Sequence, residues 1–310
     1  PAAVKAAAVC TVPRSTPPIS IDGSTCRTWG PAASAPIPGM LDFETPICNL
    51  MSMLIDASMT NEPEPRFLTQ EDGTRIAYHH TLGKAPGVIF CGGFMSDMTG
   101  TKATALEEAC KEQGRAYTRF DYRGHGQSDG VFEEGTIGLW TEDALAVLDQ
   151  VSEGPQVVVG SSMGGWIMLL LARARPQKIA GLVGVAPAPD FVLRMWDGFS
   201  DEIKTTLKRD GVYRAPSEYS DKPYSITMNL IEEGRKHLIL QQPLKVNYPV
   251  RILHGMEDPD VPWRQSLEIV NRLLGEDVIV TFSKSGDHRL SEPDDIVRLT
   301  HTVETLACKV

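Results

Sequence analysis

The chain has 310 residues, and 42% of them are hydrophobic, which is enough to bury a large core. Its formal net charge is −10. An acidic surface repels nucleic acid and anionic membranes, so we expect neither as a partner. No apolar run approaches the ~20 residues that a transmembrane helix requires, so we expect no transmembrane segment. None of the six cysteines lies in a C-x-x-C motif, which argues against a zinc or redox site.

Residues 1–62 differ in composition from the rest of the chain. They are rich in Ala, Pro, Ser and Thr, and the first forty positions hold a single acid, Asp22. Low acid content with Ser and Arg is typical of an organellar targeting segment, although the prolines disfavour an amphipathic helix. The alternatives are a disordered tail, or an upstream extension joined to a protein that starts at Met51 or Met53. We therefore predict a targeting segment or a disordered tail over 1–62 and one folded domain over 63–310.

From about Arg66 the chain alternates short apolar runs with amphipathic segments. Such alternation predicts an α/β fold with a mostly parallel sheet and helices on both faces. The predicted strands are 74–80, 87–91, 116–122, 156–159, 179–186, 250–254 and 278–282. The predicted helices are 101–113, 139–151, 163–173, 263–274 and 294–307.

The segment at about 187–245 interrupts this alternation. It has a helical pattern, is rich in Met, Trp and Tyr, and contains several prolines. Open α/β folds bind their ligands beyond the carboxyl ends of the strands. We therefore predict a helical lid insertion over that edge of the sheet.

The central motif is 160–164, which reads G-S-S-M-G and fits G-x-S-x-G with Ser162 in the middle. A β-branched strand precedes it and an apolar helix follows. A tight strand-to-helix turn of this kind exposes the central hydroxyl above the sheet. Glycine at 160 and 164 makes the turn possible, because a side chain there would clash with the neighbouring helix or strand. Ser162 is therefore the predicted nucleophile, whereas Ser161 lies one position before the apex and is expected to point elsewhere.

A serine hydroxyl needs a base to accept its proton, and the partners of such a serine follow it in the order acid, then histidine. His288 lies in a loop directly after a predicted strand, where a base can reach the turn at Ser162. We predict His288 as the base. His254 lies within a strand and is expected to be structural, while His237 lies in the insertion and His301 on the last helix.

The acid that orients this imidazole is expected in the loop after strand 250–254. Three acids lie there, Glu257, Asp258 and Asp260, and position alone does not choose among them. The stretch from His254 to Pro262, which reads H-G-M-E-D-P-D-V-P, resembles the acid loop of many α/β-hydrolases. In that family the acid is the Asp three residues after the Gly, so the resemblance implies Asp258.

Stabilisation of the oxyanion needs two N–H donors near the nucleophile. One is expected at Met163, directly after the nucleophile. The loop after strand 87–91 reads G-G-F-M and resembles the His-Gly-x loop of the α/β-hydrolases, which implies the Phe94 amide as the second donor. Here Cys91 and Gly92 stand where many members have His. The loop 120–130, F-D-Y-R-G-H-G-Q-S-D-G, further resembles the D-x-x-G-x-G-x-S loop of that family.

Four stretches narrow the resemblance: 93–103, 160–166, 254–256 and 287–289. They resemble a mitochondrial thioesterase branch of the α/β-hydrolase-domain family. This resemblance implies a mitochondrial protein that removes S-acyl groups such as palmitate from cysteine and hydrolyses acyl-glucuronide esters. The alternative is a cytoplasmic protein, if 1–62 is not a targeting segment.

The predicted activity is a serine esterase or thioesterase that forms an acyl-enzyme and needs no metal or organic cofactor. An acyl-ester or acyl-thioester, on a protein or on a small molecule, is the expected partner. Apolar side chains predicted to line an acyl groove are Met95, Met98, Met195, Trp196 and Met228, with core packing as the alternative. A general carboxylesterase, a C–C hydrolase, a cofactor-free haloperoxidase and a non-catalytic binding protein are the competing hypotheses.

Overall fold

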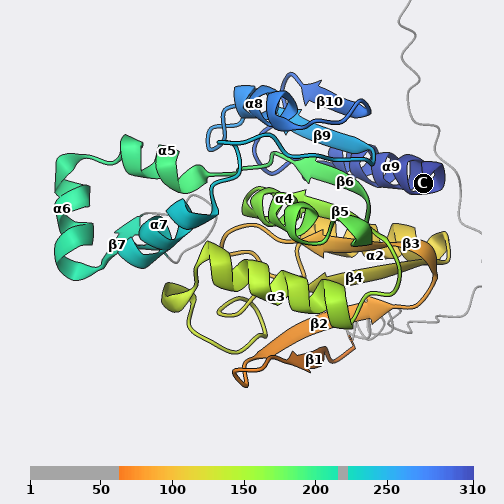
Figure 1. Cartoon of the computed structure of the whole chain (residues 1–310), viewed down its shortest axis with the longest axis horizontal. Helices are drawn as coiled ribbons and strands as arrows, with labels where there is room; N and C mark the ends of the chain where they lie inside the picture. The colour runs from red at the N-terminus through yellow and green to blue at the C-terminus, as the bar shows by residue number, and fades with distance from the viewer. Residues whose placement is uncertain (1–62, 216–222) are drawn as a thin grey trace, which may run out of the picture. The chain divides into compact units, whose positions relative to one another are not determined.

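The computed structural model describes residues 63–215 and 223–310 (Figure 1). The expectation for 1–62 concerns a segment that lies outside the described residues. In the described part of the chain, no helix combines the length and the apolar character that crossing a membrane would require.

The described chain is built around an eight-stranded sheet with the order β1-β2-β4-β3-β5-β6-β9-β10. The pairs β1–β2 and β2–β4 are antiparallel, and every other neighbouring pair is parallel. The mostly parallel α/β sheet is therefore confirmed. The strands are β1 (Arg66–Thr69), β2 (Arg75–Thr81), β3 (Lys84–Cys91), β4 (Arg115–Phe120), β5 (Gln156–Ser161), β6 (Ile179–Val185), β9 (Val250–Gly255) and β10 (Val278–Ser283).

Helices cover both faces of this sheet (Figure 1). Strand β5 is buried along its whole length, and its side chains alternate between two apolar clusters. Val158 packs with the helices of one face, whereas Val157 and Val159 pack with those of the other. On the first face lie α3 (Ile137–Gln150), α4 (Met163–Ala174) and α8 (Arg264–Arg272), and on the second lie α2 (Thr101–Glu112) and α9 (Pro293–Lys309).

Every predicted strand and helix of the sheet region is present, with ends within three residues of those predicted. Strand β1 was not predicted from the sequence. It has four residues, none of them buried, and it pairs only with β2 at the edge of the sheet. A strand without a buried face lacks the apolar alternation by which strands are predicted.

In its described residues, 186–215 and 223–249, the chain between β6 and β9 makes no strand of the main sheet. It forms α5 (Phe191–Gly198), α6 (Asp201–Asp210), β7 (Val212–Ala215), β8 (Tyr224–Thr227) and α7 (Met228–Gly234). The predicted helices are present, and the segment also contains β7 and β8, which pair antiparallel and were not predicted. We call residues 187–245 the insertion, and its action as a lid remains a prediction.

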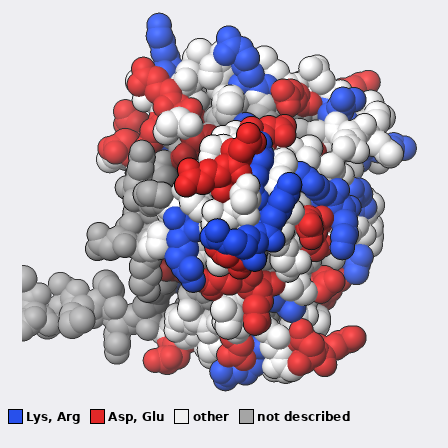
Figure 2. Space-filling view, turned by 90° about the vertical axis from the view of Figure 1, so that its left-hand side faces the viewer, with Lys and Arg blue, Asp and Glu red and all other residues white. Residues whose placement is uncertain are grey.

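Figure 2 shows the side of the molecule on which α6 and β7 lie in Figure 1. Lysine and arginine form a band across this face, with acidic groups above and below it. Three basic side chains surround Trp196. The charged groups of Lys204, Lys208 and Arg235 each lie within 6 Å of its ring centre. The acidic net charge is therefore not spread evenly over the surface.

Candidate active site

Ser162 lies at the turn between β5 and α4 and has a left-handed backbone, with φ 54°. The glycines around it allow this turn. A Cβ at position 160 would lie 2.3 Å from the carbonyl oxygen of Gly164, and a Cβ at position 164 would lie 2.0 Å from that of Cys91. The predicted clashes with the neighbouring helix and strand are thereby confirmed. The Ser162 hydroxyl lines a cleft, and Ser161 is buried beside it.

The candidate oxyanion donors both lie beside Ser162. Met163 is the first residue of α4, so its N–H has no acceptor within the helix and points toward the helix N-terminus. Phe94 follows Gly93, whose own Cβ position is 3.5 Å from the Ser162 Cβ. The Phe94 ring packs edge-on against Phe132 and Phe191. Both predicted donor residues therefore line the cleft at Ser162.

His288 lies in the loop between β10 and α9, 126 positions after Ser162. Its Nε2 is 2.9 Å from the Ser162 Oγ, and its Nδ1 is 2.8 Å from Asp258 Oδ2. Because a carboxylate only accepts, Nδ1 carries the proton and the serine hydroxyl donates to Nε2. The structure therefore brings the predicted nucleophile, base and acid into one chain of hydrogen bonds.

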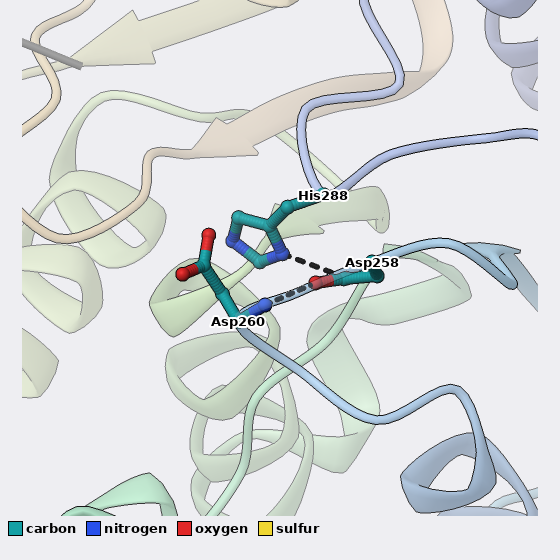
Figure 3. Close-up of side chains that lie close together, drawn as sticks. All are labelled: Asp258, Asp260 and His288. Carbon is teal, nitrogen blue, oxygen red and sulfur yellow. Dashed lines mark hydrogen bonds and ion pairs between the residues drawn. The ribbon is translucent and has the colours of Figure 1, made fainter. Parts of the chain in front are cut away.

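Asp258 accepts a hydrogen bond from His288 Nδ1, and its side chain is fully buried. Burial would raise its pKa, but hydrogen bonds from His254, His288 and the Val261 N–H outweigh burial and hold the pKa of Asp258 well below its ordinary value. Glu257 is exposed. Figure 3 shows the Asp260 carboxylate on the opposite side of the imidazole ring from Asp258.

One contact to the acid was missed by the sequence reasoning. His254, the second-last residue of β9, has its Nε2 3.2 Å from Asp258 Oδ2. The spacing of four residues between them was visible, but a strand followed by an irregular loop gives no rule for which side chains meet. The structural role expected for His254 therefore includes direct contact with the candidate acid.

A half-buried lysine holds the loop that carries His288. Lys102, at the start of α2, donates from Nζ to the Arg289 carbonyl at 2.6 Å and to Ser291 Oγ at 3.4 Å. Burial, reinforced by the nearby Arg289 charge, lowers the pKa of Lys102 to about 8. The residue directly after the candidate base is thus fixed to a helix on the second face of the sheet.

The cleft above Ser162 has a volume of about 640 Å³. One part of its lining is apolar and comes mainly from the loop after β3 and from the insertion. Met95 and Met195 line the cleft as predicted, whereas Met98 is buried in the core, and Trp196 and Met228 lie outside the cleft. The apolar lining residues from these two segments are Phe94, Met95, Ala188, Phe191, Met195, Tyr224 and Ile226.

Within residues 63–215 and 223–310, the set of side chains with spacing suited to a metal ion is Asp258, Asp260 and His288, whose possible ligand atoms lie within 4.8 Å of one another. Two of these side chains already bond to each other through His288 Nδ1 and Asp258 Oδ2. The same atoms are thus engaged in the serine–histidine–aspartate chain, which is a complete arrangement for nucleophilic catalysis.

The fold and this chain of hydrogen bonds define an α/β-hydrolase, and within that class a serine hydrolase that acts on ester or thioester bonds. A family model described as serine aminopeptidase, S33, matches residues 86–213. The chain is 41% identical over 292 residues to the mitochondrial palmitoyl-protein thioesterase ABHD10 of Bos taurus, a match that covers 92% of this chain and 94% of that protein. The chain belongs to the ABHD10 family.

Other relatives agree with this assignment. The Homo sapiens protein of the same name is 40% identical over 298 residues, again with 92% and 94% coverage. The solved structure of the mouse α/β-hydrolase domain-containing protein 10 has a TM-score of 0.74 and 42% identity, and covers 80% of this chain and 99% of that chain. A putative hydrolase from Agrobacterium vitis S4 has a TM-score of 0.76 at 38% identity, covering 79% and 100%. The names of the mammalian relatives confirm the mitochondrial location for the family.

Proposed function

We propose that this enzyme removes long acyl groups from cysteine thioesters, with acyl-glucuronide esters as second substrates. The observation that carries the proposal is the continuous chain from Ser162 Oγ through His288 to Asp258, with links of 2.9 and 2.8 Å. The relatives that match along most of the chain are named palmitoyl-protein thioesterases, which supports the thioester class.

In the first step His288 Nε2 accepts the Ser162 hydroxyl proton while Oγ attacks the acyl carbonyl carbon. Asp258 keeps the imidazole in the tautomer with the proton on Nδ1 and stabilises the imidazolium that forms. The tetrahedral intermediate collapses when the bond to the thiolate or glucuronate oxygen breaks. His288 gives its proton to that leaving group, and the acyl chain remains on Ser162.

The negative charge that develops on the carbonyl oxygen needs donors fixed in advance. The N–H groups of Met163 and Phe94 flank Ser162, and we assign them as the donors to this oxygen. A donor of this kind contributes about 10²–10³-fold in rate. The first turn of α4 adds a favourable helix dipole at the same place.

In the second step His288 accepts a proton from water, the hydroxide attacks the acyl-enzyme, and Ser162 is regenerated as the fatty acid leaves. The low pKa of Asp258 keeps its carboxylate ionised throughout this cycle. The apolar part of the cleft suits an acyl chain, because Phe191, Met195 and Ile226 offer flexible and aromatic surface next to the nucleophile.

The test compares wild type with Ser162→Ala on S-palmitoyl peptides, acyl glucuronides and p-nitrophenyl esters. Wild type should hydrolyse the S-palmitoyl peptide and bind a fluorophosphonate probe covalently, and Ser162→Ala should do neither. Ser161→Ala is the matched control, since it changes the neighbouring hydroxyl and should retain probe labelling. Turnover by Ser162→Ala at the wild-type rate would refute the mechanism, and turnover confined to p-nitrophenyl esters would refute the substrate class.

A further inference from the structure

The imidazole of His254 lies beneath the candidate catalytic acid. His254 belongs to β9, which pairs with β6 and β10, so its backbone is held within the sheet. Its side chain is fully buried. A buried imidazole needs partners for both ring nitrogens, and here each nitrogen has at least one.

The partners fix which nitrogen of His254 carries the proton. Nε2 lies 3.0 Å from the Val261 carbonyl, which can only accept, so Nε2 is protonated. Nδ1 lies 2.6 Å from Ser266 Oγ, whose hydroxyl can donate to it. The ring therefore presents an N–H toward the Asp258 side of its pocket, where Oδ2 lies 3.2 Å away.

Each carboxylate oxygen of Asp258 accepts two hydrogen bonds. Oδ1 accepts from the N–H groups of Asp260 and Val261, each at 2.8 Å. Oδ2 accepts from His288 at 2.8 Å and from His254 at 3.2 Å. A carboxylate has about four lone-pair sites. His254 supplies the donor that comes from the sheet, while the two backbone N–H groups come from the acid's own loop.

We propose that His254 is a positioning residue for catalysis, which fixes the Asp258 carboxylate relative to the sheet and moderates its basicity toward His288. The proposal rests on the function proposed above. Outer hydrogen-bond partners of this type orient the groups that act directly, and in metal sites their loss costs about 10–100-fold in affinity or activity. Without the N–H of His254, Oδ2 holds its charge with one donor fewer, so it binds the imidazolium form of His288 more strongly.

The charged groups near His288 and Asp258 are the same in every His254 variant. A difference in pH profile between these variants therefore does not come from them. They come from the loop after β3, from α2, from α5 and from the two loops that carry the pair. These groups are Asp97, Lys102, Arg194, Asp260, Asp287 and Arg289.

Two amide variants separate the donor from the packing. His254→Gln places an amide nitrogen near the position of Nε2 and keeps a donor within reach of Asp258. His254→Asn is shorter by one methylene, ends near the position of Nδ1 and leaves Oδ2 without this donor. For each variant the measurements are kcat/KM against pH with a thioester substrate, and the melting temperature.

We expect kcat/KM of His254→Asn to fall about 10–100-fold, with the acidic limb of its pH profile moved to higher pH. His254→Gln should recover most of the rate and the wild-type limb. His125→Gln is the control, because it alters another buried imidazole, whose ring packs against Tyr122, Phe132 and Trp140. It should lower the melting temperature without moving the limb.

Equal rates and equal limbs for the Asn and Gln variants would overturn the proposal, and so would a lower melting temperature for His254→Asn with the wild-type limb. These outcomes differ from failure of the proposed function itself. That failure would appear as activity or fluorophosphonate labelling retained in Ser162→Ala, whatever the His254 variants do.

Discussion

The hydrogen bond between Asp258 and His288 determines which imidazole nitrogen is free to accept the serine proton. In Asp258→Asn an amide replaces the carboxylate, and the amide N–H can force the proton onto Nε2. The ring then cannot act as a base toward Ser162. We expect kcat to fall about 10⁴-fold, as the loss of a correct tautomer does in serine hydrolases. Steady-state kinetics with a thioester substrate measure this.

Asp260→Asn is the matched variant for Asp258→Asn. It lies two residues away and lines the cleft, but its carboxylate is on the other side of the ring from Asp258 (Figure 3). A loss for Asp260→Asn as large as that for Asp258→Asn would contradict the assignment of the acid.

Gly164 lies where α4 begins, directly against strand β3. In Gly164→Ala the added Cβ would meet the Cys91 backbone oxygen at 2.0 Å, a contact that no side-chain rotation relieves. We expect loss of activity together with a melting temperature several degrees lower, because β3 and α4 must separate. Gly198→Ala is the control, since nothing lies within 4 Å of its Cβ position, and it should behave as wild type. A fully active Gly164→Ala would show that the turn is more tolerant than its packing indicates.

At the scale of residues, a site residue could be predicted when contacts close to it in the sequence fix its place. Ser162 could be predicted because its glycines are required by contacts within a few residues and with one neighbouring strand. His288 followed from its place at the end of a predicted strand. The acid needed the family resemblance, since Glu257, Asp258 and Asp260 differ only in how the loop turns. The His254 contact depends on that same turn and on side-chain directions, which the sequence pattern does not encode.

At the scale of elements, Asp190 connects the two ends of the insertion. It precedes α5, is 8% exposed, and its carboxylate accepts the N–H groups of Ile239 and Leu240 at 2.8 and 3.0 Å. In Asp190→Ala these groups lose their acceptor, so we expect the free energy of unfolding to fall by about 1–3 kcal/mol. Urea denaturation measures this.

Two further variants complete that experiment. Asp190→Asn retains one acceptor oxygen and should fall between wild type and Asp190→Ala. The exposed Asp197 on α5 provides the control, and Asp197→Ala should unfold like wild type. Equal stability of Asp190→Ala and Asp197→Ala would show that the insertion does not depend on this connection.

The insertion is also where the element prediction failed. Strands β7 and β8 have four residues each and are separated by residues 216–223, so no tight-turn signal joins them. Their pairing is decided by packing against the rest of the insertion rather than by local pattern. In the sheet region, by contrast, buried parallel strands require long apolar runs, and these runs predicted each strand directly.

At the scale of the whole molecule, one buried histidine links stability to pH. Burial lowers the pKa of His125 to about 4, and its buried Nε2 has no hydrogen-bond partner among the described residues. Below the ordinary value of about 6.5 the unfolded chain binds a proton that the native protein does not. The free energy of unfolding should therefore fall as the pH decreases from 6.5 towards 4, by up to about 3 kcal/mol from this residue.

Urea denaturation at several pH values between 7 and 4.5 tests this dependence. His125→Gln should flatten the pH dependence, whereas His301→Gln, at an exposed position on α9, should leave it as in wild type. Asp258 acts at lower pH, since a carboxyl group with a lowered pKa loses its stabilising effect only as the pH falls below about 3.8. Identical pH dependence in wild type and His125→Gln would contradict the assignment.

The left-handed backbone of Ser162 places the hydroxyl at the cleft, but the same conformation lowers the stability of the folded protein. A residue with a side chain in such a conformation costs about 1–3 kcal/mol, and glycine, which is relaxed there, has no hydroxyl. Selection for turnover and selection for thermal endurance therefore oppose each other at this position. The burial of strand β5 beneath Ser162 offsets this cost in stability. Substitutions that loosen the packing around β5 are therefore expected to reduce activity before the protein unfolds.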